Sequence, residues 1–162
     1  MRGALIDYRL FKSLKRILIK MSEAKHGTTL IFGFKGNPKD KNLFQPGAIE
    51  LKIPYGSNLL ELEFPRAIVS DDSKDKKLIE LINIYEKAII SLSKTDGAMI
   101  FNQNLDLILA GAFLKTKSSA SLTGGARRKS AEGFIRDNPD TIAIVISQDG
   151  SITLLPKVVI GE

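Results

Sequence analysis

Two glycines followed by three consecutive cations form the most chemically informative stretch of the sequence, Gly124-Gly125-Ala126-Arg127-Arg128-Lys129. The helical pattern that follows predicts that the cations lie in the first turn of a helix. Glycines let a backbone approach an anion closely, free N–H groups at a helix start favour negative charge, and arginine offers two parallel hydrogen bonds. The stretch therefore predicts a phosphate site, with a solvated basic first turn as the structural alternative. Cations in a first turn oppose the helix dipole, a small cost that a bound anion would remove.

A second candidate is the acid in Thr95-Asp96-Gly97-Ala98, which precedes an apolar stretch typical of a strand. An aspartate at a strand start can project into a cleft at the sheet edge, where it could hold a divalent metal or a ribose hydroxyl. Asp-Gly is also ordinary turn chemistry, so these residues alone favour a turn.

Together, the two motifs resemble the diadenylate cyclase family, the domain found at the start of the DNA-integrity scanning protein and in the membrane-linked bacterial cyclases. Family members carry an Asp-Gly-Ala motif on a strand and, after a hairpin and a loop, a Gly-Thr-Arg-His-Arg motif that opens a helix. Here Asp96-Gly97-Ala98 and Gly125-Ala126-Arg127-Arg128-Lys129 stand in the same order at a similar separation. The family's Gly-Ala-rich strand looks like Gly27 to Phe34, and its Val-Ser-Glu-Glu-Thr-Gly turn looks like Ile146-Ser147-Gln148-Asp149-Gly150.

Alternating strand and helix signals around two hairpins predict an α/β fold, a mixed β-sheet with helices packed against it, like that of the family, and the chain length predicts one domain over residues 1–162. The resemblance implies that two domains face each other, each with one ATP and a divalent metal (Mg²⁺ or Mn²⁺), and condense the ATP into cyclic di-AMP with release of pyrophosphate. Asp96 would serve the metal or the attacking 3′-hydroxyl, and Arg127 and Lys129 would hold phosphates. The implied nucleotide-binding residues are Gly97, Ala98, Gly124, Gly125, Ala126, Arg127, Arg128 and Lys129. We expect an adenine nucleotide as ligand and a homodimer or higher homo-oligomer as the assembly.

Four departures from the family pattern fall on or near the reactive motif: Ala126 for Thr, Arg128 for His, Lys129 for the final Arg, and Gln148 for an acid. Positive charge is kept, so phosphate binding is expected to survive. The loss of an acid at position 148 leaves Asp96 and Asp149 as candidate metal ligands. We therefore favour a nucleotide-binding sensor or regulatory member over an active cyclase.

Other catalytic classes find little support in the sequence. His26 is the only histidine, and we interpret it as structural, although its place before Gly27 could put it near a pocket mouth. No nucleophile-elbow pattern accompanies it, which argues against a Ser-His-Asp hydrolase, and no Walker motif is present.

Three segments have the pattern of helices: Tyr8–Glu23, Lys76–Leu92 and Ala126–Asp137. The first has an apolar stripe that includes Phe11 and a basic arc, which we interpret as a solvated face rather than a membrane-surface or nucleic-acid contact. Strands are predicted at Thr28–Phe34, Ala98–Phe101, Leu105–Ala110, Thr141–Ser147 and Ser151–Leu155, the last four as two hairpins. Thr141–Ser147 is apolar throughout, as in a strand covered on both faces. Short strands and turns are expected from Ala48 to Phe64.

Composition restricts the remaining choices. Hydrophobic residues make up 43% and charged residues 26% of the 162, as in an ordinary globular protein. No apolar run approaches the ~20 residues that span a bilayer, so membrane insertion is not expected. The absence of cysteine and of a secretory signal favours the cytoplasm. A net charge of +6 suits a polyanion, which keeps a basic nucleic-acid-binding module as an alternative, although aromatic residues for stacking are few.

Overall fold

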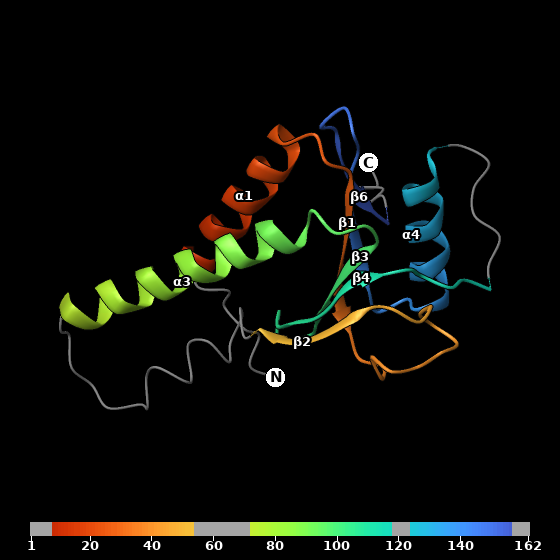
Figure 1. Ribbon diagram of the computed structural model, residues 1–162, viewed down its shortest axis with the longest axis horizontal. Helices are drawn as coiled ribbons and strands as arrows, with labels where there is room; N and C mark the ends of the chain where they lie inside the picture. Colours follow the sequence, from red (N-terminus) through yellow and green to blue (C-terminus); the bar gives the residue numbers. More distant parts are fainter. Residues whose placement is uncertain (1–7, 54–71, 118–123, 157–162) are drawn as a thin grey trace, which may run out of the picture.

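In the computed structural model, which describes residues 8–53, 72–117 and 124–156, a six-stranded sheet lies between two layers of helix (Figure 1). The elements follow the chain as α1 (Tyr8–Glu23), β1 (Thr28–Phe34), β2 (Ile49–Ile53), α3 (Asp72–Leu92), β3 (Ala98–Asn102), β4 (Leu107–Ala112), α4 (Ala126–Asp137), β5 (Ile142–Ile146) and β6 (Ile152–Leu155). None of these helices is long and apolar enough to cross a membrane.

The sheet is mixed, with the strand order β2-β4-β3-β1-β5-β6. Only the central strands β1 and β3 pair in parallel, and Thr29 lies opposite Ala98; the other pairs are antiparallel. Because parallel strands begin at the same edge, the residues before β1 and those before β3 lie side by side. The predicted α/β class with a mixed sheet and two hairpins is confirmed.

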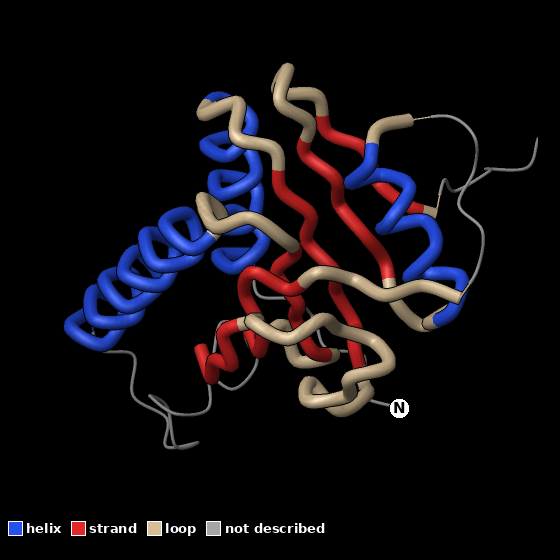
Figure 2. Tube along the Cα trace, turned by 45° about the vertical axis from the view of Figure 1, so that its right-hand side comes forward, coloured by secondary structure: helices blue, strands red, loops and turns tan. Residues whose placement is uncertain are grey.

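Helices cover both faces of the sheet. Helices α1 and α3 pack together on one face and α4 lies alone on the other, as Figure 2 shows. The sheet therefore has two apolar cores. The α1–α3 core holds Ile17, Met21, Leu30, Phe32, Ile82, Ile89, Met99, Phe101, Leu107 and Ile146. Alternate strand residues point to the α4 core, as the period of two requires.

Helix α1 matches its predicted bounds, but its apolar stripe is narrower than predicted. Phe11 is 57% exposed, whereas Ile17 and Met21 are buried. Phe11 lies about 120° around the helix from Ile17, at 100° per residue, and so falls outside the contact with α3. On the opposite edge of that contact, Arg16 donates hydrogen bonds to the buried carboxylate of Glu86 on α3.

Three strand and helix predictions needed correction. Helix α3 begins at Asp72, four residues before the predicted start. Strand β4 starts at Leu107 rather than Leu105, because the Asn102 side-chain oxygen accepts the amides of Asn104 and Asp106 and extends the turn. Strand β5 is not covered on both faces, since Ile142 is 46% exposed beyond the reach of α1 and α3. Residues 54–64, which belong to the segment where short strands and turns were predicted, lie outside the described residues.

Candidate functional site

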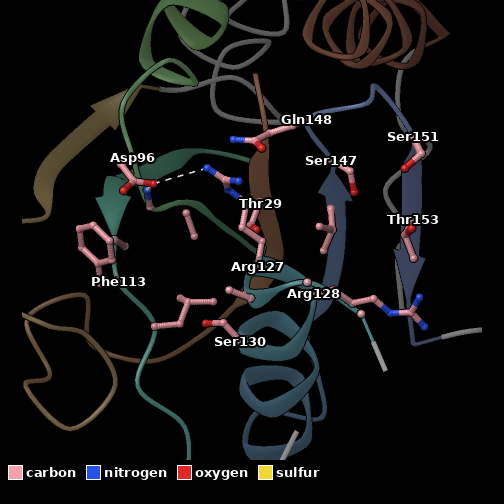
Figure 3. Close-up of a pocket in the computed structure, with 18 residues that line it drawn as sticks. Thr29, Asp96, Phe113, Arg127, Arg128, Ser130, Ser147, Gln148, Ser151 and Thr153 are labelled. Carbon is pink, nitrogen blue, oxygen red and sulfur yellow. Dashed lines mark hydrogen bonds and ion pairs between the residues drawn. The ribbon is translucent and has the colours of Figure 1, made fainter. Parts of the chain in front are cut away.

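A pocket of about 730 Å³ opens at the sheet edge where β1 and β3 begin, under the first turn of α4 (Figure 3). Its lining residues come from the starts of β1 and β3, the end of β4, the start of α4 and the β5–β6 hairpin: Thr29, Asp96, Gly97, Ala98, Ala112, Phe113, Leu114, Gly124, Gly125, Ala126, Arg127, Arg128, Ser130, Val145, Ser147, Gln148, Ser151 and Thr153. Both sequence motifs therefore meet in one cavity.

The Asp96-Gly97 turn presents a carboxylate at the mouth of this pocket. Gly97 has φ +100°, and a Cβ there would lie 2.6 Å from the carbonyl carbon of Gly111, so only glycine fits. The turn leaves the Asp96 side chain 74% exposed, with its Oδ1 accepting the Gly97 amide at 3.0 Å. Most of the Asp96 carboxylate is thus accessible to a ligand.

Arg127 reaches across the pocket from α4 toward β3. Its Nη2 lies 3.7 Å from Asp96 Oδ1, an ion pair that is too long to be a hydrogen bond. The Arg127 side chain is 35% exposed and passes over Gly27, the residue before β1. The guanidinium is therefore in place for an anion without being saturated by its partner.

Arg128 is held differently. Its Nε donates to Glu132 Oε1 at 2.9 Å, one turn further along α4, and it passes over Gly124, where a Cβ would lie 2.7 Å from its Cδ. In Figure 3 the two guanidinium groups lie on opposite sides of the first turn, with Arg127 toward Asp96 and Arg128 toward β6. One ligand that touches both must span the start of the helix.

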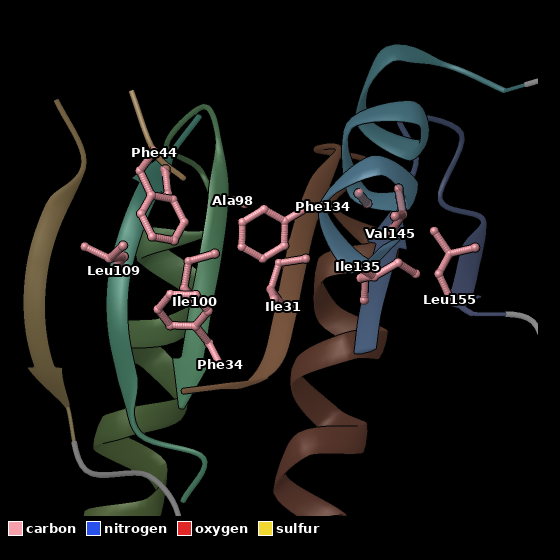
Figure 4. Close-up of a cluster of buried hydrophobic side chains, with 13 residues drawn as sticks. Ile31, Phe34, Phe44, Ala98, Ile100, Leu109, Phe134, Ile135, Val145 and Leu155 are labelled. Atoms are coloured by element: carbon pink, nitrogen blue, oxygen red, sulfur yellow. The ribbon is translucent and has the colours of Figure 1, made fainter. Parts of the chain in front are cut away.

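The start of α4 leaves its amides available to an anion. The first turn has neither a side-chain cap nor an acidic residue. Further along, Ala131, Phe134 and Ile135 are buried against the sheet and fix the helix there (Figure 4). Lys129 does not line the pocket, in contrast to Arg127 and Arg128.

The two walls of the pocket differ in polarity. Near β3 and β4 the lining is apolar and includes Ala98, Ala112 and Phe113. Phe113 is partly exposed. The wall formed by β5 and β6 carries the hydroxyls of Ser147, Ser151 and Thr153. Such a pocket can take a ligand with one apolar flat part and one polar, anionic part.

Comparison with known proteins identifies the family. Residues 16–158 match the family described as DisA bacterial checkpoint controller nucleotide-binding. The chain belongs to this family. The resemblance carried by Asp96-Gly97-Ala98 and the Gly125–Lys129 motif is thereby confirmed.

Two solved structures support the DisA-family fold. The first is a double mutant of DacA from Staphylococcus aureus, with a TM-score of 0.53, 20% identity, and coverage of 90% of this chain and 80% of that chain. The second is a hypothetical membrane spanning protein from Bacillus cereus, with a TM-score of 0.50 and 20% identity. This similarity covers 89% of the present chain and 58% of the Bacillus chain. No curated protein matches the chain by sequence.

The acidic residues of the DisA-family pocket are few. Asp149 does not line the pocket; its Oδ1 accepts the Ser151 amide at 2.9 Å, and this hydrogen bond lowers the pKa of Asp149. Among the described residues, no three histidine, cysteine or acidic side chains gather as a metal cluster. Asp96 is the only carboxylate that lines the pocket, within the described part of the chain. Mg²⁺ can bind through one carboxylate and substrate phosphates, so Asp96 fits a metal only together with a nucleotide.

Several lining residues were not singled out from the sequence. Thr29 and Phe113 carry no motif, and only the strand pairing and the end of β4 bring them to the pocket. Gly27, which lies under Arg127, was predicted only as the start of the segment that resembles the family's Gly-Ala-rich strand and as a neighbour of His26. His26 is exposed and does not line the pocket.

Proposed function

We propose that this DisA-family domain binds an adenine nucleotide, ATP or cyclic di-AMP, and acts as a sensor or regulatory member. The observation that carries the proposal is the meeting of Arg127, Asp96 and the uncapped start of α4 in one pocket. The guanidinium of Arg127, the free amides at the start of α4 and the dipole of that helix all favour a phosphate at this point.

Each wall of the pocket has a part in this scheme. The Arg127 guanidinium and the α4 amides hold a phosphate, and Arg128 meets a second phosphate or water on the other side of the turn. The apolar wall at Ala98, Ala112 and Phe113 takes the adenine ring, since a flat heterocycle gains most from apolar and aromatic neighbours. Hydroxyls of the β5–β6 wall are left for the sugar.

A sensor is favoured by the side chains of the family motif that this pocket keeps and by those that it lacks. Two arginines line the pocket, but Ala126 has no hydroxyl and Gln148, which also lines it, has no negative charge. Binding depends on cations, whereas turnover depends on positioned acids and on charge neutralisation at the reacting phosphate. This set of residues suits binding better than turnover.

An active diadenylate cyclase is the second candidate, and the exposure of Asp96 favours it. A carboxylate that projects from the pocket mouth is accessible to a nucleotide held by a facing domain. Bound Mg²⁺ or Mn²⁺ would supply charge neutralisation at the phosphates. Asp96 would orient the 3′-hydroxyl and accept its proton, while Arg127 would hold the phosphate under attack. Such a reaction needs a homodimer or higher homo-oligomer.

Incubation with ATP and Mn²⁺ or Mg²⁺, followed by chromatography of the products, separates the two candidates. A sensor leaves ATP intact and binds ATP or cyclic di-AMP in calorimetry, whereas a cyclase releases pyrophosphate and cyclic di-AMP. Binding of neither nucleotide, together with salt-sensitive binding of duplex DNA, would replace both with the nucleic-acid alternative. The cytoplasm, where ATP is abundant, is the expected location.

A further inference from the structure

Gly27 lies directly beneath the guanidinium that we assign to phosphate binding. It is a buried residue that immediately precedes β1. A Cβ added to Gly27 would lie 2.7 Å from Arg127 Nη1, 3.0 Å from Arg127 Cζ and 3.3 Å from Gln148 Cγ. No side chain fits between the backbone at Gly27 and the guanidinium in its present position.

The backbone itself does not require glycine at this position. Gly97 and Gly124, which also lie in the site, have φ +100° and +104°, where other residues are strained. Gly27 is outside that left-handed region. The lack of a side chain at Gly27 is therefore needed for the space above the backbone, which Arg127 occupies, and not for the backbone conformation.

We propose that Gly27 is a positioning residue that sets the location of the Arg127 guanidinium. The inference rests on the proposed nucleotide binding. Arg127 starts on α4, on one face of the sheet, and must cross the start of β1 to approach Asp96 beside β3. Gly27 leaves the passage open, and Gln148 borders it.

A methyl group at Gly27 would move the guanidinium rather than the fold. The atoms that it would meet are the far end of a flexible side chain, and a shift of about 1 Å restores ordinary contact. An arginine fork forms two parallel hydrogen bonds only when its plane is correctly placed, so this shift weakens phosphate binding.

The test is calorimetric titration of ATP or cyclic di-AMP into the full chain carrying Gly27→Ala, Arg127→Ala or both. We expect Gly27→Ala to weaken binding by about tenfold, the lower end of the loss expected when the charge-assisted hydrogen bond of Arg127 is removed altogether. In the Arg127→Ala background, Gly27→Ala is expected to cause no further loss. Gly36→Ala is the matched control, because its Cβ would lie equally close, 2.7 Å, to the Phe34 ring, away from the pocket; it should leave affinity unchanged.

The outcomes are distinguishable. If the parent binds neither ATP nor cyclic di-AMP in the same titration, the proposed function fails and this inference with it. If the parent binds and Gly27→Ala binds equally well, or loses the same factor with and without Arg127, Gly27 does not position that side chain and the inference alone is overturned. If the Gly27→Ala variant does not fold but the Gly27→Ala/Arg127→Ala variant does, the added methyl group collides with Arg127 and the proposal is supported. If neither variant folds, the proposal is overturned.

Discussion

Replacement of Arg127 by alanine removes the group on which the proposed function depends most, and the structure indicates little cost to the fold. Its only ion pair among the described residues is with Asp96, at 3.7 Å and with the carboxylate 74% exposed. Such solvated pairs contribute at most about 1 kcal/mol. Arg127→Ala should therefore unfold at nearly the same denaturant concentration as the parent.

Loss of binding should be much larger than loss of stability. A charge-assisted hydrogen bond contributes about 1.5–3 kcal/mol, so its removal weakens nucleotide binding by about 10- to 100-fold. Arg127→Lys should recover part of this loss, because lysine keeps the charge but lacks the bidentate fork. Titration calorimetry with ATP and with cyclic di-AMP measures both effects.

The matched control is Arg136→Ala, which removes the same charge from the last turn of α4, outside the pocket. It should leave affinity within about twofold, since an exposed charge at this distance from the ligand is largely screened. If Arg127→Ala binds both nucleotides as tightly as the parent, the phosphate assignment is wrong. Equal losses in Arg127→Ala and Arg136→Ala would show that only net charge matters.

Four further predictions address other parts of the molecule. Asp96→Asn should lower metal-dependent ATP binding or turnover while sparing metal-free binding, which calorimetry with and without Mg²⁺ can check. Glu86→Gln should lower the free energy of unfolding by about 1–2 kcal/mol in urea, because it removes the charge that Arg16 meets; an unchanged midpoint would contradict this. The pKa of Asp149, followed by carboxyl NMR, should lie below the usual 3.8. The stability that this carboxylate contributes should be fully present above the pKa of the unfolded chain and should be lost as the pH falls through the lower pKa of the folded protein. Self-association should be weak or nucleotide-dependent in sedimentation; a strict monomer at saturating ATP and metal would argue against the cyclase candidate.

Local sequence pattern was sufficient to predict the bounds of α1, α4 and β1. The period of 3.6 in α1 and the helical pattern that starts after Gly125 predicted both helices at their observed bounds, because each depends on one face packing against a sheet. The apolar run at Thr28–Phe34 likewise predicted β1 without error. Patterns failed where a boundary depends on a side chain, as at Asn102, whose carbonyl extends the turn before β4.

The sequence by itself determined the family, the mixed α/β class and the two motifs that carry charge to the site. Only the tertiary structure decided how they meet, because parallel pairing of β1 and β3 brings Gly27 next to the Asp96 turn across a long stretch of chain. The same packing excluded Lys129 from the pocket lining and held Asp149 in its own turn. Space above a glycine is a property of what packs over it, and that is why the role proposed for Gly27 has no signature in the sequence.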